Sequence, residues 1–369
     1  MQKNIYFFIG TTAELIKLSP VIKEFKKRKI DFKIIASNQN VLNFDELKAL
    51  LDKQQAYYTF KFKPMRLPKN IYLQFVIWAI KAFTNHLLYF RNEFKGLDKK
   101  NSFFIVHGDT VSALLGAIIA KIYRIPLVHI ESGLRSFNFF EPFPEEFCRF
   151  IVSHLTDIHF CPNSWAVNNL RNHKGAKIDT KNNTLIESLT TILKVTSKFK
   201  YFKLPQKKYF LLVLHRQEHI LFRKNLTKYF LNLFTQYTNE DLACVLVLHK
   251  LTERFLNKEG LMAKLRKNKN YIFVPRLPYP DFIQLMKKAE FIATDGGSNQ
   301  EESYYLGKPC IILRDVTERI EGLGENVVLS KEDNFTIKNF LNNYKKYRRD
   351  TVPIKPPPSK IIVDYLLKH

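Results

Sequence analysis

The sequence predicts an α/β protein with two Rossmann-like domains, each a doubly wound parallel sheet, facing each other across a central cleft. Short apolar runs alternate with segments of helical spacing in both halves of the chain. The runs are nearly continuous rather than alternating, which is typical of parallel strands that helices cover on both faces. At 369 residues the chain is also long enough for two domains.

The first domain is predicted over residues 1–170. Strands are expected at 4–9, 32–36, 102–106, 126–130 and 158–160. Helices are expected at 14–29, 71–90 and 110–123. In the first of these helices, apolar residues recur at helical spacing and cationic residues gather at the C-terminal end, where they complement the helix dipole.

The second domain is predicted over residues 171–355. The signal weakens between about 164 and 208, which we interpret as the crossing between domains, and the strand–helix alternation then restarts. Strands are expected at 209–214, 242–248, 271–274, 291–294 and 309–313. A terminal helix over 359–369, after a run of three prolines, is expected to pack back on the first domain.

A formal net charge of +25 favours an anionic partner. The basic residues are spread along the whole chain without a nucleic-acid-binding motif, so nucleic acid is not the expected partner. The basic run 61–69 and the apolar segment 71–90 fit two interpretations. Residues 61–90 could rest on an anionic membrane surface, or the segment could be a core helix beside a solvated loop.

The N-terminus and the cysteines predict a cytoplasmic protein, with peripheral contact at the inner membrane face as the variant that residues 61–90 suggest. No signal peptide is indicated, because the chain enters a strand pattern directly. The four cysteines lie in apolar segments without C-x-x-C pairing, which predicts buried free thiols in a reducing compartment.

Carboxylates follow two predicted strands of the first domain. Asp109 and Glu131 each come directly after such a strand, and Glu145 and Glu146 stand at a predicted helix start. Carboxylates gathered in a cleft raise one another's pKa, which makes an acid or base usable near neutral pH, as glycosyl chemistry requires. Each position could instead cap a helix or enrich its first turn, so the residues alone leave both interpretations open.

The second domain offers a candidate phosphate site. Residues 295–302 read Asp-Gly-Gly-Ser-Asn-Gln-Glu-Glu between a predicted strand and a predicted helix, where glycines and free N–H groups suit a phosphate. An ordinary glycine turn is the alternative. His215 ends another strand beside Arg216, which favours phosphate or proton chemistry. The stretch His215–His219 lacks the order of a zinc-binding H-E-x-x-H helix, so no metal is expected.

A series of motifs, in this order, resembles the non-hydrolysing UDP-N-acetylglucosamine 2-epimerases. They are His107–Thr110, His129–Arg135, Pro144–Arg149, His215–Glu218, Gln300–Glu302, Leu306–Pro309 and Arg314–Arg319. The resemblance implies a GT-B-type fold with a UDP-sugar in the cleft. It also implies elimination of UDP with loss of the C2 proton, re-addition with inverted C2, and no cofactor. A homodimer and a role in surface polysaccharide synthesis are further expectations.

The resemblance also assigns roles to residues. Asp109, Glu131 and Glu145 match the acid/base carboxylates, and His215 matches a histidine near the UDP phosphates. The expected substrate-binding residues are Lys17, Arg149, Phe282, Gly296, Gly297, Ser298, Glu301, Glu302 and Arg319.

Four loops depart from the family pattern. Residues 37–40 read Ser-Asn-Gln-Asn where the family has a Gln-His-Arg stretch, and residues 182–184 read Asn-Asn-Thr where it has Gly-Asn-Thr. The first loop reads Gly-Thr-Thr-Ala-Glu over residues 10–14, where the family has Gly-Thr-Arg-Pro-Glu, and residues 295–298 read Asp-Gly-Gly-Ser for Asp-Ser-Gly-Gly. These departures keep an alternative open: a glycosyltransferase of this fold, with a nucleotide-sugar donor and a lipid-linked or polysaccharide acceptor at the inner membrane face. A third, non-enzymatic interpretation, a nucleotide-sugar sensor, would predict loss of the carboxylates, and they are present.

Overall fold

The computed structural model describes residues 3–37, 39, 40, 42, 50, 51, 57–59, 71–194, 205–354 and 356–369. The chain forms two compact units, Met1–Ser188 with Ile354–His369, and Leu189–Pro353. The sequence predicted the division between residues 170 and 171. It falls later because β7 (Ala176–Asp179), inside the stretch interpreted as the crossing, pairs with β6 (Ile158–Cys161) and completes the first sheet.

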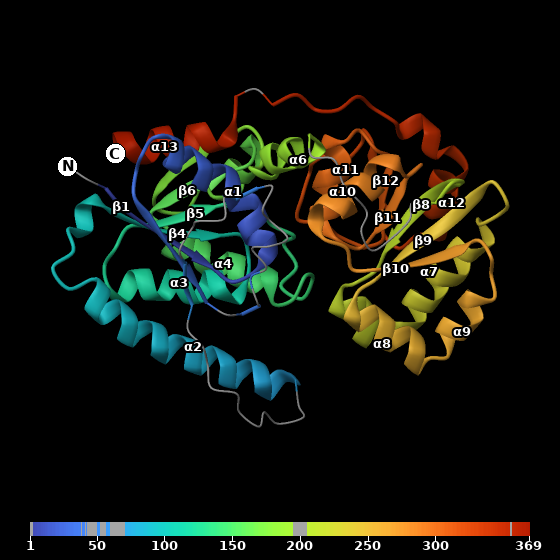
Figure 1. Ribbon diagram of the computed structural model, residues 1–369, viewed down its shortest axis with the longest axis horizontal. Coiled ribbons are helices and arrows are strands. Elements are labelled where there is room, and N and C mark those ends of the chain that lie inside the picture. Colours follow the sequence, from blue (N-terminus) through green and yellow to red (C-terminus); the bar gives the residue numbers. More distant parts are fainter. Residues whose placement is uncertain are drawn as a thin grey trace. The chain divides into compact units, whose positions relative to one another are not determined.

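The first unit holds a parallel sheet of seven strands in the order β3-β2-β1-β4-β5-β6-β7 (Figure 1). Its other strands are β1 (Asn4–Ile9), β2 (Phe32–Ala36), β3 (Tyr57–Thr59), β4 (Ser102–His107) and β5 (Leu127–Ile130). The central strands are buried along almost their whole length, as their continuous apolar runs predicted. Their side chains therefore form the core between two layers of helices.

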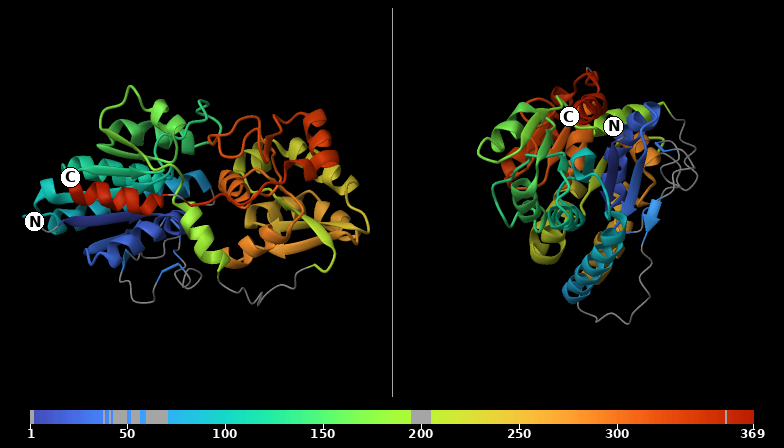
Figure 2. Two further views of the ribbon diagram at one scale, coloured as in Figure 1. Left: turned by 90° about the horizontal axis from the view of Figure 1, so that it is seen from above. Right: turned by 90° about the vertical axis from the view of Figure 1, so that its left-hand side faces the viewer.

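The helices of the first unit cover both faces of this sheet. They are α1 (Thr12–Lys27), α2 (Ile71–Glu93), α3 (Val111–Ile122), α4 (Glu145–Leu155), α5 (Ser164–Asn169), the first turn of α6 (Leu185–Leu193) and α13 (Pro358–Lys368). Thr110 begins α3, because its side chain accepts a hydrogen bond from the backbone N–H of Ala113 at 3.0 Å. The views in Figures 1 and 2 show α13 beside α1, where Arg28 and Asp364 form an ion pair of 2.6 Å.

The second unit holds a parallel sheet of six strands in the order β10-β9-β8-β11-β12-β13. They are β8 (Lys208–Val213), β9 (Leu242–Leu248), β10 (Tyr271–Pro275), β11 (Ile292–Thr294), β12 (Cys310–Ile312) and β13 (Val327–Leu329). The helices are α7 (Lys224–Gln236), α8 (Lys250–Lys258), α9 (Leu261–Arg266), α10 (Tyr279–Lys288), α11 (Gly297–Tyr305) and α12 (Asn334–Asn343). Phe210 and Phe291 stack in its core with centroids 4.8 Å apart.

Each sheet has a point where the order of the strands reverses. In the first unit this point lies between β1 and β4, and in the second between β8 and β11. Loops leave the carboxyl ends of these neighbouring strands in opposite directions, and doubly wound proteins bind ligands where they separate. The motifs at residues 107–110 and 295–302 follow β4 and β11, so the topology brings each of them to such a point.

The cysteines and the apolar helix α2 can be compared with what the sequence predicted. All four cysteines are buried and unpaired, as predicted. Among the described residues no helix is both long and apolar enough to span a membrane. The basic run 61–69 lies outside the described residues, whereas α2 confirms the helix predicted over 71–90.

Candidate active site

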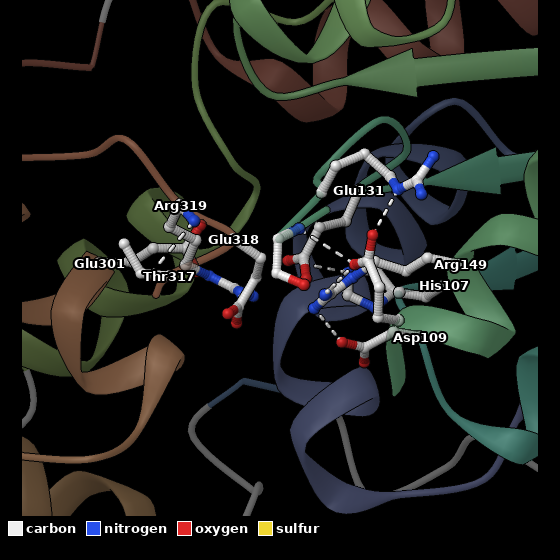
Figure 3. A network of polar contacts seen from close by, with 12 residues as sticks. His107, Asp109, Glu131, Arg149, Glu301, Thr317, Glu318 and Arg319 are labelled. Carbon is white, nitrogen blue, oxygen red and sulfur yellow. Dashed lines mark hydrogen bonds and ion pairs between the residues drawn. The ribbon is translucent and has the colours of Figure 1, made fainter. Parts of the chain in front are cut away.

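Glu131 is a buried carboxylate at the carboxyl edge of the first sheet. It follows β5 with a backbone φ of 64°, a left-handed conformation that side chains other than glycine adopt rarely. Its Oε2 receives hydrogen bonds from Lys17 Nζ and Asn183 Nδ2, and His107 Nε2 lies 3.7 Å from the same oxygen (Figure 3). The three partners come from α1, β4 and the turn before α6, so three segments fix one carboxylate.

Asp109 is the second carboxylate at this edge of the sheet. It accepts a hydrogen bond from Arg149 Nη2, and Figure 3 shows the pair beside Glu131. Glu146 holds the same arginine in place from the other side, with its Oε2 3.2 Å from Arg149 Nη1 and its Oε1 2.5 Å from Arg135 Nε. Because Glu146 is fully buried, it is a structural anchor for the two arginines.

Glu145 is placed differently from its neighbour. It is the first residue of α4 and is half-buried, whereas Glu146 points into the unit. The structure therefore brings Lys17 together with Glu131, and Arg149 together with Asp109. The roles that the resemblance assigns to Asp109, Glu131 and Glu145 stay predictions.

Two histidines shape the turns that carry the carboxylates. His129 Nε2 donates to the carbonyl of Gly108 at 2.8 Å, next to Asp109, and His159 Nδ1 lies 2.9 Å from the Ser132 hydroxyl, next to Glu131. Burial lowers the pKa of His129 to about 4 and that of His159 to about 3. Both rings are therefore neutral at physiological pH and act as scaffolding.

Glu14 is a buried carboxyl that the sequence did not single out. Its Oε2 accepts a hydrogen bond from the backbone N–H of Gly10 at 2.7 Å, which ties α1 to the end of β1. Burial raises the pKa of Glu14 to about 7, and the nearby charge of Asp109 adds to the rise, although hydrogen bonds from Gly10 and Thr110 oppose it. Glu14 is thus partly protonated at neutral pH.

Asp295, which follows β11, accepts polar contacts from the residues that follow β8 in the second unit. Its carboxylate accepts hydrogen bonds from the backbone N–H groups of His215 and Arg216, each at about 3.0 Å, and lies 3.1 Å from His215 Nδ1. His219 Nδ1 lies 3.4 Å away on the other oxygen, and Glu332 is 3.7 Å from His219 Nε2. Burial opposes ionisation, yet these histidines hold the pKa of Asp295 well below its usual range.

Two glycines allow side chains to approach the start of α11. A Cβ at Gly296 would lie 2.7 Å from His215 Cε1, and one at Gly297 would lie 2.5 Å from Glu318 Oε1. Either contact would force a neighbour to move. The predicted glycine loop therefore serves packing, and the phosphate contact expected at the start of α11 stays a prediction.

A buried network of charges surrounds this helix start. Glu318 accepts from Arg314 Nη1 at 2.9 Å and from Arg319 Nη1 at 2.6 Å, while Arg319 Nε lies 3.2 Å from Glu301 Oε2 (Figure 3). Arg216 Nη2 is 3.6 Å from Glu318 Oε1. Glu218 Oε1 lies 3.7 Å from Arg216 Nη1, so the three guanidinium groups face three carboxylates, Glu318, Glu301 and Glu218. Guanidinium groups are the donors that suit an anionic group such as a diphosphate.

The remaining predicted residues of the second unit lie on α10 and α11. Glu302 is buried and accepts from Asn299 Nδ2 at 2.9 Å. Burial raises the pKa of Tyr279 far above its ordinary value, and the charge and hydrogen bond of Glu302 add to this, so the phenol stays neutral. The side chains of Phe282 and Ser298 are half-buried. Among the described residues no group of three His, Cys, Asp or Glu side chains is arranged to hold a metal ion.

Comparison with known proteins shows which family these motifs belong to. The family model described as UDP-N-acetylglucosamine 2-epimerase matches residues 93–355. The chain belongs to this family. The UDP-N-acetylglucosamine 2-epimerase of Methanocaldococcus jannaschii is 31% identical over 91% of this chain and 90% of the relative. The Neisseria meningitidis enzyme of the same name is 31% identical over 98% of each chain.

Solved structures of the epimerase family share the fold. The M. jannaschii UDP-GlcNAc 2-epimerase in complex with UDP-GlcNAc and UDP matches with a TM-score of 0.78 at 27% identity, over 100% of both chains. The N. meningitidis enzyme bound to UDP-GlcNAc matches with the same TM-score at 28% identity, over 100% of both chains. The MurG structure of Acinetobacter baumannii, at 14% identity and a TM-score of 0.53 over 100% of both chains, shares the two-domain fold alone.

Several residues of the site were missed by the sequence analysis. Asn183 holds Glu131 in place, Glu14 holds the end of β1, and Glu318 holds Arg319. Glu318 lies within the Arg314–Arg319 motif and Asn183 within residues 182–184, but neither position was given a role of its own. Glu14 had a signal, because a carboxylate at the start of an apolar helix face can only be buried if it finds a partner or a proton.

Proposed function

We propose that this protein is a UDP-N-acetylglucosamine 2-epimerase that inverts C2 of a UDP-linked N-acetylhexosamine for surface polysaccharide synthesis. The observation that supports it most directly is the pairing of acid/base candidates with cations in the first unit: Glu131 with Lys17, and Asp109 with Arg149. Family membership supplies the substrate class, because relatives that carry this name match the chain over nearly its whole length.

The proposed reaction needs no redox step. One carboxylate of the first unit removes the C2 proton as the C1–O bond breaks, so UDP leaves with the bonding electrons and a C1–C2 double bond forms. UDP then adds back to C1, and C2 receives a proton on its opposite face. Asp109, Glu131 and Glu145 are the candidates for the base and the acid, and atoms and charge balance over the cycle.

The second unit is proposed to bind the nucleotide. The N–H groups at the start of α11 and the guanidinium of Arg319 suit the diphosphate, and His215 is held next to Asp295 for contact with it. N–H and guanidinium donors stabilise UDP as a leaving group, because negative charge accumulates on the diphosphate as the C1–O bond breaks. The remaining predicted contacts, Glu301, Glu302, Ser298 and Phe282, belong to the same proposal.

Incubation with UDP-GlcNAc in D₂O tests the proposal. Proton NMR should show loss of the C2 proton signal of the substrate and growth of the UDP-ManNAc epimer, with deuterium at C2 in both. An inert C2 in the presence of bound UDP-GlcNAc would refute it. Release of UDP only after addition of membranes or a polysaccharide acceptor would instead identify the glycosyltransferase.

A homodimer and a membrane contact are further parts of the proposal. The neighbouring helices α3 and α4 pack together, and each has exposed apolar side chains: Ile118 and Ile122 on α3, and Phe147 and Phe150 on α4. We propose that these side chains form an apolar surface for a second copy. Light scattering should give the mass of a dimer.

Flotation with anionic vesicles tests a membrane contact through residues 61–90. Recovery of the protein only in the unbound fraction would refute the membrane contact.

A further inference from the structure

Asn183 stands in the turn between β7 and α6, and its amide makes two different contacts. Its Oδ1 accepts a hydrogen bond from the backbone N–H of Leu185 at 3.0 Å, which caps the start of α6. Its Nδ2 donates to Oε2 of Glu131. The residue is buried, so neither contact competes with bulk water.

The contact with Glu131 is long-range, and the segment that provides it is fixed at both ends. The first compact unit ends at Ser188, whose hydroxyl donates to the carbonyl of Ile16 at 2.6 Å and lies 3.2 Å from the Ser19 hydroxyl. The segment from 183 to 188 is therefore bound to α1 at one end and to Glu131 at the other. A side chain on such a segment can hold its partner rigidly.

Three groups converge on one oxygen of Glu131. Lys17 Nζ and Asn183 Nδ2 both donate to Oε2, and His107 Nε2 faces it at 3.7 Å. The ammonium supplies charge but little direction, whereas a planar amide donates along a fixed line. Within this set the amide therefore does most to fix the rotation of the carboxylate.

We propose that Asn183 is a positioning residue, which sets the orientation in which the Glu131 carboxylate meets the sugar. This inference rests on the proposed function, because it assumes that Glu131 acts at C2. If the carboxylate rotates away from the C2 proton, the proton transfer becomes slower even though the charge remains, because a small misplacement of a reacting group lowers the rate strongly.

The two contacts of Asn183 can be separated by substitution. Asn183→Asp keeps the oxygen that caps α6 but replaces the donor to Glu131 by a second acceptor. Asn183→Ala removes both contacts. Asn182→Ala is the matched control, because Asn182 is the half-buried neighbour and its backbone carbonyl, which accepts from Thr180 Oγ1 at 2.9 Å, is retained.

The variants are compared for C2 exchange from UDP-GlcNAc in D₂O, for UDP affinity by calorimetry and for melting temperature. Asn183→Asp should lose roughly ten- to a hundredfold in the exchange rate, the range expected for one hydrogen bond to a charged group, and should be slower than Asn183→Ala. UDP affinity should match the native protein in every variant. The melting temperature should fall for both Asn183 variants, because Ala removes the cap of α6 and Asp places a second carboxylate against Glu131. Asn182→Ala should melt and exchange like the native protein.

If Asn183 had a purely structural role, the order of the two exchange rates would be reversed. Asn183→Asp would then exchange like the native protein while Asn183→Ala lost stability and rate together, which would overturn the proposal. A crystal structure of Asn183→Asp provides a readout independent of activity. A Glu131 carboxylate that has turned away from residue 183 supports the proposal, and one that keeps its native position overturns it. An inert native protein would refute the proposed function, while this structural readout would still decide the inference.

Discussion

Replacing Glu14 by Gln should change how the stability of the protein depends on pH. The carboxyl is buried, with a pKa of about 7 in the folded protein against an ordinary value of 4.5. A carboxyl with a raised pKa favours the folded state fully below the ordinary value, and this contribution is lost as the pH rises toward 7. Above pH 7 the folded protein therefore carries the cost of a buried charge.

The magnitude follows from the two pKa values. Between pH 5 and pH 8 the free energy of unfolding should fall by roughly 2 to 3 kcal/mol because of this one group. The fall is steepest between the two pKa values, where the carboxyl is ionised in the unfolded state and protonated in the folded state. Glutamine is nearly the same shape and can still accept from the Gly10 N–H, but it does not titrate. The Glu14→Gln protein should therefore gain stability relative to the native protein by that amount over this range.

Urea unfolding of both proteins at half-unit steps from pH 5 to pH 8 measures the effect. Glu24→Gln is the control on the same helix, because Glu24 is half-buried and pairs with Arg28 at 2.8 Å. Its difference from the native protein should vary by less than about 0.5 kcal/mol over the range. Unfolding free energies of native and Glu14→Gln protein that run parallel from pH 5 to pH 8 would refute the reasoning.

Three further predictions concern single contacts. The pKa of His219, measured by NMR titration of its ring, should be about 9, because Asp295 and Glu332 outweigh its burial; the stabilisation it provides should be complete below pH 6.5 and lost as the pH rises through 9. A pKa at or below 6.5 would contradict the network. Glu146→Gln should lower the free energy of unfolding by about 3 kcal/mol in urea, since it leaves buried guanidinium groups without their charge partner; a loss below about 1 kcal/mol would contradict that role. Gly297→Ala should weaken UDP binding at least about tenfold, because its Cβ would displace side chains at the start of α11; native affinity in calorimetry would show that the loop tolerates the methyl group.

Much of the fold and the position of the site could be predicted from the sequence. Continuous apolar runs identified the central strands, and polar motifs directly after them had to lie at the carboxyl edge of each sheet. The pairs of Asp109 with Arg149 and of Glu131 with Lys17 therefore formed among residues already predicted. The family match and the solved structures confirm the fold and the family predicted from these motifs.

The remainder depended on contacts that leave no local pattern. The strands β3, β7 and β13 have only three or four residues each and were not predicted. They lie at the edges of their sheets, where a strand needs no long apolar run. Of the two adjacent carboxylates at the start of α4, the sequence could not tell which points inward, since this depends on where the first turn begins. Asn183 reaches Glu131 across 52 positions of sequence, a distance that only the folded chain closes.

In the proposed function, carboxylates of the first unit move the C2 proton and the second unit binds UDP. The most direct test is the C2 exchange rate of Glu131→Gln in D₂O, measured with its UDP affinity. We expect exchange to fall by at least about a hundredfold, as for loss of a general acid or base, while the dissociation constant for UDP stays within about twofold of the native value. Native exchange in this variant, or a loss of UDP affinity that matches the loss of rate, would contradict it.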